Sequence, residues 1–281
     1  MKKFILNTIL FSFLAFFFIE IFSLGLIYTN IYTYYLPGKE IYQSISKSKQ
    51  KKNTKKLLLG DSVGRQLFPN SSNNNSINSL ACNQAIGMVG HFILLNNYIN
   101  SGNEIETVFL VFTPFSFRNN LDQKYTFHYF LKPFYKNEFS NLFTENVNHQ
   151  IDKIPFKDFC RVPHILATSW APHFESMDKI NYTFLSPISV EYLNKIKQLS
   201  VKYKFNLIIL PTPTNINKKH LIDKLDRKEI VNNNLTDEFK NYFENIIYLD
   251  STYFSDGTHL INPKEFTEYY KLNLLNTSRI H

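Results

Sequence analysis

Four short apolar runs, each ended by a turn or a proline, limit what this chain can fold into. They are Lys56–Asp61, Val108–Phe112, Asn206–Leu210 and Ile246–Leu249, and Ser79–Ala85 is a weaker fifth candidate. Apolar residues follow one another in these runs without alternation. Such runs are typical of strands that are buried on both faces, as in a parallel sheet.

Helical patterns lie between the candidate strands. They cover Val89–Asn100, Val190–Tyr203, Asn234–Glu244 and Lys264–Leu274, and Pro263 suits the start of the last. Strands that alternate with helices predict an α/β fold with helices on both faces of the sheet.

One segment interrupts this alternation, at about 115–185. Phe115–Phe184 holds 16 aromatic residues among 70 and has no clear period. One interpretation is an insertion over the carboxyl ends of the strands, where open α/β sheets bind ligands. The other is an irregular subdomain that fills its own core with aromatic rings. We therefore predict an α/β domain over 56–281 with an aromatic-rich insertion.

The N-terminal segment 1–30 is a candidate transmembrane anchor. Phe4–Tyr28 is a run of 25 residues with one ionisable side chain, Glu20. As a helix it would extend about 37 Å, enough to cross a hydrocarbon core of about 30 Å. A cleaved signal peptide has a shorter apolar region and ends in a small-x-small site. Only Ser23-Leu24-Gly25 resembles such a site, so an anchor is favoured.

The net charge of +8 comes from the N-terminal part of the chain. Residues 1–56 hold nine Lys or Arg and two acidic residues, whereas 57–281 holds 22 basic and 21 acidic residues. The segment 31–55 therefore looks like a basic linker, and the body lacks the clustered positive charge of a nucleic-acid-binding face.

The flanking charges give opposing signals for membrane orientation. Lys2 and Lys3 favour a cytoplasmic N-terminus, and seven Lys residues between 39 and 56 oppose it under the positive-inside rule. Long domains are often translocated despite flanking charge. We therefore expect the folded domain to be translocated and the protein to cross the membrane once. Its N-terminus would be cytoplasmic, and its folded domain would lie in the periplasm or at the cell surface.

The first chemical motif is Gly60-Asp61-Ser62, directly after the first candidate strand. A serine there lies at the carboxyl end of a strand, with a helix beginning behind it. Its backbone N–H can then point at a developing oxyanion. Gly60 would allow the tight turn. The alternative is that Asp61 or Ser62 only caps the helix.

The second motif is Asp256-Gly257-Thr258-His259, after the last candidate strand. An Asp three residues before a His can hold the ring Nδ1–H and leave Nε2 to accept a serine proton. On its own, His259 is equally well explained as a polar turn residue. Together the two motifs supply the nucleophile, base and acid that acyl transfer needs.

The pair of motifs resembles the GDSL, or SGNH, hydrolase superfamily. Leu58-Leu59-Gly60-Asp61-Ser62 and Asp256-Gly257-Thr258-His259 carry the resemblance. It implies a flavodoxin-like three-layer α/β/α sandwich without metal or cofactor. Ser62 would be the nucleophile, His259 the general base and Asp256 its partner.

The resemblance also indicates where the oxyanion hole lies. Asn83–Gly90 falls at the family's second block, so the backbone N–H of Ser62 would be joined by that of Gln84 or Gly87. Many members complete the hole with an Asn side chain from a Gly-x-Asn-Asp block after the third strand. Here that strand runs into Thr113-Pro114-Phe115-Ser116, and the pair at 119–120 comes too late to align. Loss of one oxyanion donor typically costs about 10²–10³ in rate.

The expected protein is a membrane-anchored serine esterase or O-acyltransferase. It would act on acyl esters, with acetyl the expected group, of a cell-surface glycan. This layout is similar to that of membrane-tethered family members that act on surface polysaccharides or teichoic acids. A membrane acyl-donor protein would be a partner of a transferase. The alternative is an inactive polysaccharide-binding or assembly module of the same fold. A nucleotide-binding flavodoxin-like domain is disfavoured, because Gly60-Asp61-Ser62 lacks phosphate-loop glycine spacing.

Other polar residues give weaker signals. Cys82 is expected to be a buried structural thiol, and whether it pairs with Cys160 is open. Trp170 suits core packing better than sugar stacking, and Arg65 suits an anionic substrate or a solvated surface equally. Four histidines of the insertion lack metal-ligand spacing: His128, His149, His164 and His173.

Overall fold

The sheet is parallel, as the apolar runs predict. A computed structural model describes residues 1–29, 31, 38–70, 76–123, 125–154, 157 and 183–276. Its main sheet has the order β2-β1-β3-β4, formed by β1 (Lys56–Gly60), β2 (Asn78–Ser79), β3 (Thr107–Phe112) and β4 (Asn206–Pro211). A second parallel pair, β5 (Thr214–Asn215) and β6 (Tyr248–Leu249), follows β4 along the chain.

The strand side chains alternate between two separate cores. In β1, Leu57 and Leu59 belong to one apolar cluster, and Leu58 belongs to the other. In β3, Val108 and Leu110 face the first cluster, whereas neighbouring side chains face the second. Both faces of these strands are therefore covered, which explains why their sequences are apolar throughout.

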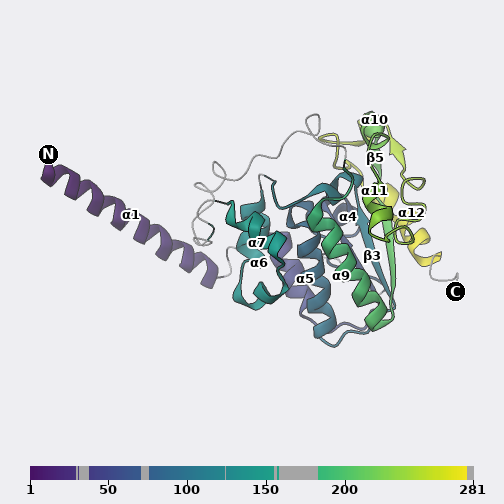
Figure 1. The fold of residues 1–281 in the computed structure, drawn as a ribbon, viewed down its shortest axis with the longest axis horizontal. Coiled ribbons are helices and arrows are strands. Elements are labelled where there is room, and N and C mark those ends of the chain that lie inside the picture. Colours follow the sequence, from purple (N-terminus) through teal and green to yellow (C-terminus); the bar gives the residue numbers. More distant parts are fainter. Residues whose placement is uncertain are drawn as a thin grey trace.

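Helices cover both faces of the sheet (Figure 1). The first cluster is closed by α3 (Lys39–Ser48), α5 (Gly87–Asn100) and α9 (Pro187–Tyr203), which pack against one another. The second is closed by α4 (Ser62–Leu67) and α12 (Lys264–Asn276). The molecule is thus an α/β protein with three layers, a parallel sheet between two layers of helices.

The segment 31–55 is more than a linker, because helix α3 within it packs on the body. Ile41 is fully buried in the first cluster. The hydroxyl of Ser48 accepts a hydrogen bond from Asn97 Nδ2 at 3.2 Å. Only a narrow stripe of α3 is apolar, and its buried serines contact polar partners: Ser48 bonds to Asn97 of α5, and Ser44 bonds to Asn70. Because α3 is polar, the sequence predicts a linker here. In the structure, the folded body begins at about Gly38.

The helix expected over Asn234–Glu244 is wrong. The structure has a chain of hydrogen-bonded turns there, preceded by the short helix α11 (Lys228–Asn232). Asn234 and Asn241 both have positive φ, 55° and 58°. Asparagine tolerates this left-handed conformation, which ends a helical run at each of the two positions. The apolar spacing still serves the core, because Phe239 and Tyr242 are buried.

The described part of the aromatic-rich segment packs mainly beside α5 and α9. Most of its buried rings belong to the first cluster, and Tyr192 Oη of α9 donates a hydrogen bond to the carbonyl of Leu142 at 2.8 Å. Only its start, near Phe115 and Gln123, borders a pocket at the strand ends. Both interpretations of the segment therefore hold in part, whereas Trp170 lies outside the described residues.

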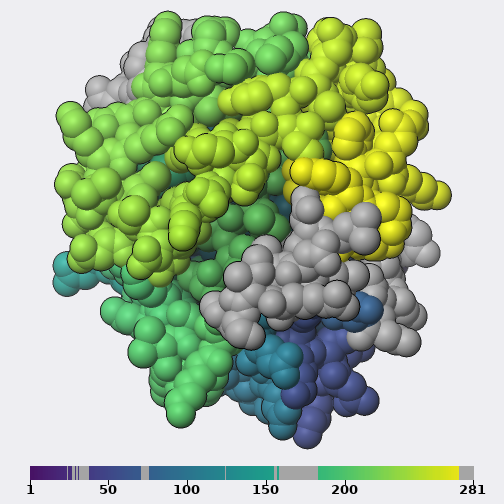
Figure 2. All heavy atoms as spheres, turned by 90° about the vertical axis from the view of Figure 1, so that its right-hand side faces the viewer, coloured from purple at the N-terminus to yellow at the C-terminus, as the bar shows by residue number. Residues whose placement is uncertain are grey.

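Short elements connect the main layers. They are the turns η1 (Gln84–Ile86), η2 (Pro114–Arg118), η4 (Asn137–Leu142), η6 (Ile216–Lys218) and η7 (Ser251–Tyr253), the π-helical turn η3 (Phe127–Leu131), and the helices α6 (Lys132–Phe134), α7 (Glu145–Asp152) and α10 (Lys219–Ile222). Figure 2 shows that the chain from α10 to α12, green to yellow, covers the upper part of one face.

The N-terminal apolar run forms the helix α1 (Lys2–Tyr28), which projects away from the body (Figure 1). Lys2–Ser23 is long and apolar enough to cross a membrane, and its most apolar window is fully exposed. An apolar helix whose side chains are largely exposed suits a lipid environment. The expectation of a membrane-spanning segment is thus supported by length and composition.

Candidate active site

Ser62 lies where the strand order of the sheet reverses. Strand β1 ends at Gly60, Asp61 caps α4, and Ser62 is the first residue of that helix. The neighbours of β1 are β2 on one side and β3 on the other. In open parallel sheets, the crevice at such a reversal is the usual ligand site.

Three predicted side chains meet at this crevice. His259 Nε2 lies 2.8 Å from Ser62 Oγ, and His259 Nδ1 lies 2.7 Å from Asp256 Oδ2. An ionised carboxylate can only accept, so Nδ1 carries the ring proton and Nε2 is free to accept the serine hydroxyl. The geometry is that of a nucleophile, a base and an acid that orients the base.

A tight loop holds the acid and the base. Asp256 Oδ1 also accepts hydrogen bonds from the backbone N–H of Thr258 at 3.0 Å and of His259 at 2.8 Å. Gly257 has φ of 75°, a conformation that favours glycine. Partial burial raises the pKa of Asp256, but the hydrogen bonds from His259 and Thr258 outweigh it and bring the pKa to about 2. Asp256 is therefore ionised at neutral pH.

Asp61 joins the nucleophile turn to the loop after β3. It is 1% exposed, and its Oδ1 accepts from the N–H groups of Val63 and Gly64, both at 3.0 Å. Its Oδ2 accepts from the N–H of Thr113 and the hydroxyl of Ser116, both at 2.6 Å. One carboxylate thus satisfies four donors, and it caps the helix that begins at the candidate nucleophile.

Gly60 is required by space rather than by a special turn conformation. Its φ is not positive, and a Cβ placed on it would lie 2.9 Å from the carbonyl oxygen of Val111. Gly64, which the sequence did not single out, is tighter, at 2.6 Å from the same oxygen. These two glycines let α4 lie directly against β3, which sets the position of Ser62.

Gln66 connects the two halves of the site and was not expected from the sequence. Its Nε2 donates to the carbonyl of Leu260 at 3.1 Å, and its Oε1 accepts from the Leu260 N–H at 2.9 Å. This paired amide contact joins α4 to the residue that follows His259, across 194 positions of sequence. The loop of the base is thereby held in register with the helix of the nucleophile.

For a triad that turns over esters, replacing Gln66 with alanine is expected to lower kcat about tenfold and to leave the fold intact. The loss would come from a looser distance between Nε2 and Oγ, since small misplacements of a reacting group are costly. Steady-state kinetics with circular dichroism would check this. Gln150, which is half-buried on α7, provides the control: Gln150→Ala should retain activity. An unchanged kcat in Gln66→Ala would contradict the role.

The candidate oxyanion donors differ in whether they already donate a hydrogen bond within this structure. The N–H of Gly87, which has φ of 60°, donates to the carbonyl of Gln84. It is therefore already used in this structure. The side chain of Asn119 donates to the same carbonyl at 2.6 Å, so it supports the turn. The backbone N–H groups of Ser62 and Gln84 remain the best candidates for the two donors.

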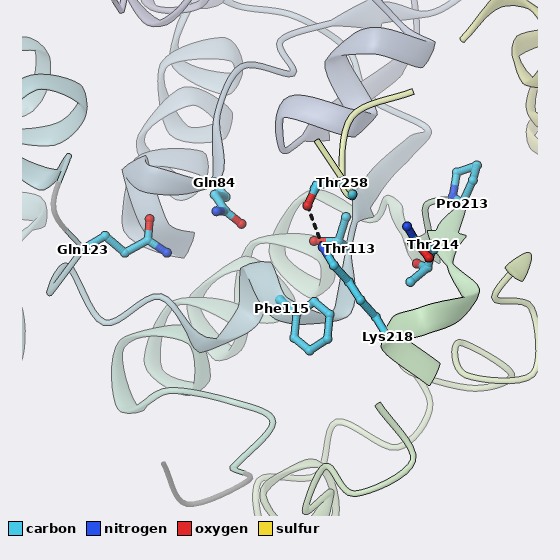
Figure 3. Close-up of a pocket in the computed structure, with 10 residues that line it drawn as sticks. Gln84, Thr113, Phe115, Gln123, Pro213, Thr214, Lys218 and Thr258 are labelled. Atoms are coloured by element: carbon cyan, nitrogen blue, oxygen red, sulfur yellow. Dashed lines mark hydrogen bonds between the residues drawn. The ribbon is translucent and has the colours of Figure 1, made fainter. Parts of the chain in front are cut away.

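A pocket of about 240 Å³ is lined in part by the two residues between Asp256 and His259 (Figure 3), whereas the three triad residues are not among those that line it. Its walls include Gly257 and Thr258 from the loop of the base, and Gln84 and Thr113 from the nucleophile side. Lys218 borders the same space, and its Nζ donates a hydrogen bond to Thr258 Oγ at 2.6 Å. The pocket is polar at these positions.

The other expected residues lie away from this pocket. Burial raises the pKa of Cys82 to about 12, which fits an inert structural thiol. Arg65 is half-buried on α4 and does not line the pocket. His128 is buried and His149 is exposed. Within the described ranges, no three His, Cys, Asp or Glu side chains form a metal-binding group. Cys160, His164 and His173 lie outside the described residues.

Comparison with known proteins identifies no relative. No family model, curated protein or solved structure matches this chain. The functional interpretation therefore depends on the residues and geometry of the site.

Proposed function

We propose that this protein is a membrane-anchored serine enzyme that transfers acyl groups through the triad Ser62, His259 and Asp256. The observation that carries the proposal is the unbroken chain of hydrogen bonds from Ser62 Oγ through the His259 ring to Asp256. Ser62 and His259 are 197 positions apart in the sequence, so their meeting is not a local effect of chain geometry. The resemblance to the GDSL/SGNH superfamily points to the same chemistry.

In the proposed reaction, Ser62 Oγ attacks the carbonyl carbon of an ester and passes its proton to His259 Nε2. Asp256 stabilises the imidazolium that forms. The N–H groups of Ser62 and Gln84 hold the oxyanion of the tetrahedral intermediate. The carbon–oxygen bond to the leaving alcohol breaks, and that oxygen takes the proton from Nε2. A water or a second hydroxyl then attacks the acyl-serine by the same route in reverse.

The second acceptor decides between two outcomes. Water makes the protein an esterase, and a sugar hydroxyl makes it an O-acyltransferase. The apolar helix α1 favours an enzyme held at a membrane. We further propose that its body lies outside the cytoplasm, since long domains are often translocated despite flanking charge. A surface glycan bearing acetyl esters is the substrate that best suits this placement. A transferase there would need a membrane partner that supplies acyl groups.

The direct test is covalent labelling of the nucleophile. The full-length protein in detergent would be treated with a fluorophosphonate probe, and turnover of p-nitrophenyl acetate would be followed. We expect labelling at Ser62 that is absent in Ser62→Ala and strongly reduced in His259→Ala. Peptide mapping would identify the labelled serine.

Matched controls lie on the same chain. Ser140 and His149 are exposed residues away from the pocket, so Ser140→Ala and His149→Gln should label like the wild type. Labelling that survives Ser62→Ala would contradict the proposal. A folded wild type that neither labels nor turns over esters, yet binds glycan in both triad variants, would support the non-catalytic binding module instead.

A further inference from the structure

Lys218 has an unusual position for a lysine. It ends η6 directly after β5 and reaches across the pocket toward the loop of the base (Figure 3). Its ammonium lies 5.9 Å from the centre of the Phe115 ring and 2.6 Å from Thr258 Oγ. The side chain thus brings a positive charge to the wall of the pocket, where it is bonded to Thr258 of the loop that holds Asp256 and His259.

The charge of Lys218 is incompletely balanced. Within the part of the chain that the structure describes, its hydrogen bond is to the neutral hydroxyl of Thr258, and no carboxylate lies within 4.0 Å. An ammonium has three donors, so two remain for another group. Partial burial lowers the pKa of Lys218, and the more distant charge of Asp256 opposes that effect. Asp256 itself is already engaged by His259.

The neighbouring Lys219 shows the contrast. Its Nζ lies 2.6 Å from Asp223 Oδ2 in an exposed ion pair, and it is not among the residues that line the pocket. A lysine that served only as a solvated surface charge would be exposed, as Lys219 is. Lys218 instead gives up part of its hydration to face a pocket beside the triad, which is costly without an anionic partner.

We propose that Lys218 binds an anionic group carried by the substrate, so that the enzyme prefers acyl esters of acidic glycans over those of neutral ones. This inference rests on the proposed function for the ester, and it assigns the specificity-determining residue. The shared chemistry is an oxyanion next to the esterified sugar hydroxyl, either a carboxylate or a phosphate. The Thr258 hydroxyl orients the ammonium, and the Phe115 ring supports it by a cation–π contact.

The test compares three acetyl esters that differ only at one carbon of the sugar. They are mono-O-acetyl methyl glucoside, the corresponding methyl glucuronoside and the corresponding glucoside 6-phosphate. The measured quantity is the ratio of kcat/KM for each anionic ester to that for the neutral one. We expect a ratio above one, about a tenfold fall of it in Lys218→Gln, and a preference for the neutral ester in Lys218→Glu. A larger fall of the ratio for the glucuronoside in Lys218→Gln would indicate a carboxylate as the preferred anion. A larger fall for the 6-phosphate would indicate a phosphate.

The matched control is Lys219→Gln, which removes an adjacent charge outside the pocket and should keep the wild-type ratio. A wild-type ratio of one would overturn the proposal. So would an equal fall for all three esters in Lys218→Gln, because that result would mean that Lys218 only supports the loop through Thr258.

A binding measurement separates this inference from the proposed function. Titration of the Ser62→Ala protein with methyl glucuronoside, glucose 6-phosphate and methyl glucoside needs no turnover. Binding of an anionic sugar that is lost in the Ser62→Ala, Lys218→Gln double variant would support the anion site even if no ester were hydrolysed. Equal binding of neutral and anionic sugars, or no binding of either anion, would overturn it.

Discussion

Replacing Ser62 with alanine is expected to lower kcat toward an ester by about 10⁴-fold or more. The variant loses the only group that can form the acyl-enzyme bond, while the oxyanion donors and the pocket remain. His259→Ala should cause a loss of similar size, since an unassisted serine hydroxyl is a weak nucleophile. Steady-state rates and burst kinetics on p-nitrophenyl acetate would measure both.

The double variant provides the sharper result. Because the two residues act as a unit, Ser62→Ala with His259→Ala should be no slower than the worse single variant. Asp256→Asn should cost less than either, through a wrong ring tautomer. Since the pKa of Asp256 is about 2, its protonation should not shape the rate profile above about pH 3. Additive losses in the double variant would contradict the triad.

The part of the fold that the sequence predicts is the part where burial determines composition. Strands β1 and β3 are apolar because both of their faces are covered. From the sequence, a serine after β1 and a histidine after the last candidate strand are expected at the same edge of one sheet. The structure brings Ser62 and His259 together, but the strand before His259 is β6, which pairs with β5 outside the main sheet.

The rest depends on contacts that no local pattern signals. The sequence does not predict the contact of Gln66 with Leu260, because the two residues are 194 positions apart. Gly64 is required because a Cβ on it would lie 2.6 Å from the carbonyl oxygen of Val111. Helix α3 is polar except for one apolar stripe, so the sequence does not predict that it packs on α5. The turns at Asn234 and Asn241 depend on left-handed conformations that helical spacing does not show.

The expected oxyanion hole is only partly predictable from the sequence. The resemblance places a donor in the turn around Gln84, but it does not reveal that the Gly87 N–H is used within that turn. The position of the missing Asn block is occupied by Thr113 and Ser116, whose side chains are 3.0 Å apart and serve Asp61. In this protein the loop after β3 therefore positions the nucleophile turn.

Replacing Asp61 with alanine is expected to destabilise the protein by about 3–5 kcal/mol and to abolish activity. The side chain is buried, and its removal leaves the N–H groups of Val63, Gly64 and Thr113 without an acceptor. The hydroxyl of Ser116 would keep its longer contact with Gln84 Oε1, at 3.1 Å. Chemical unfolding would give the free energy, and kinetics below the unfolding midpoint would give the activity.

Two comparison variants separate the role of Asp61 from simple helix capping. Asp250 caps η7 in an exposed setting by accepting from Thr252, so Asp250→Ala should cost only about 1 kcal/mol. Asp61→Asn keeps an acceptor for α4, but its amide would face the Thr113 N–H as donor against donor. It should therefore lie between the wild type and Asp61→Ala in stability while still displacing Ser62 from His259. A fully active Asp61→Asn would mean that the hydrogen bonds that Asp61 accepts from Thr113 and Ser116 are dispensable. The helix cap alone would then position the nucleophile.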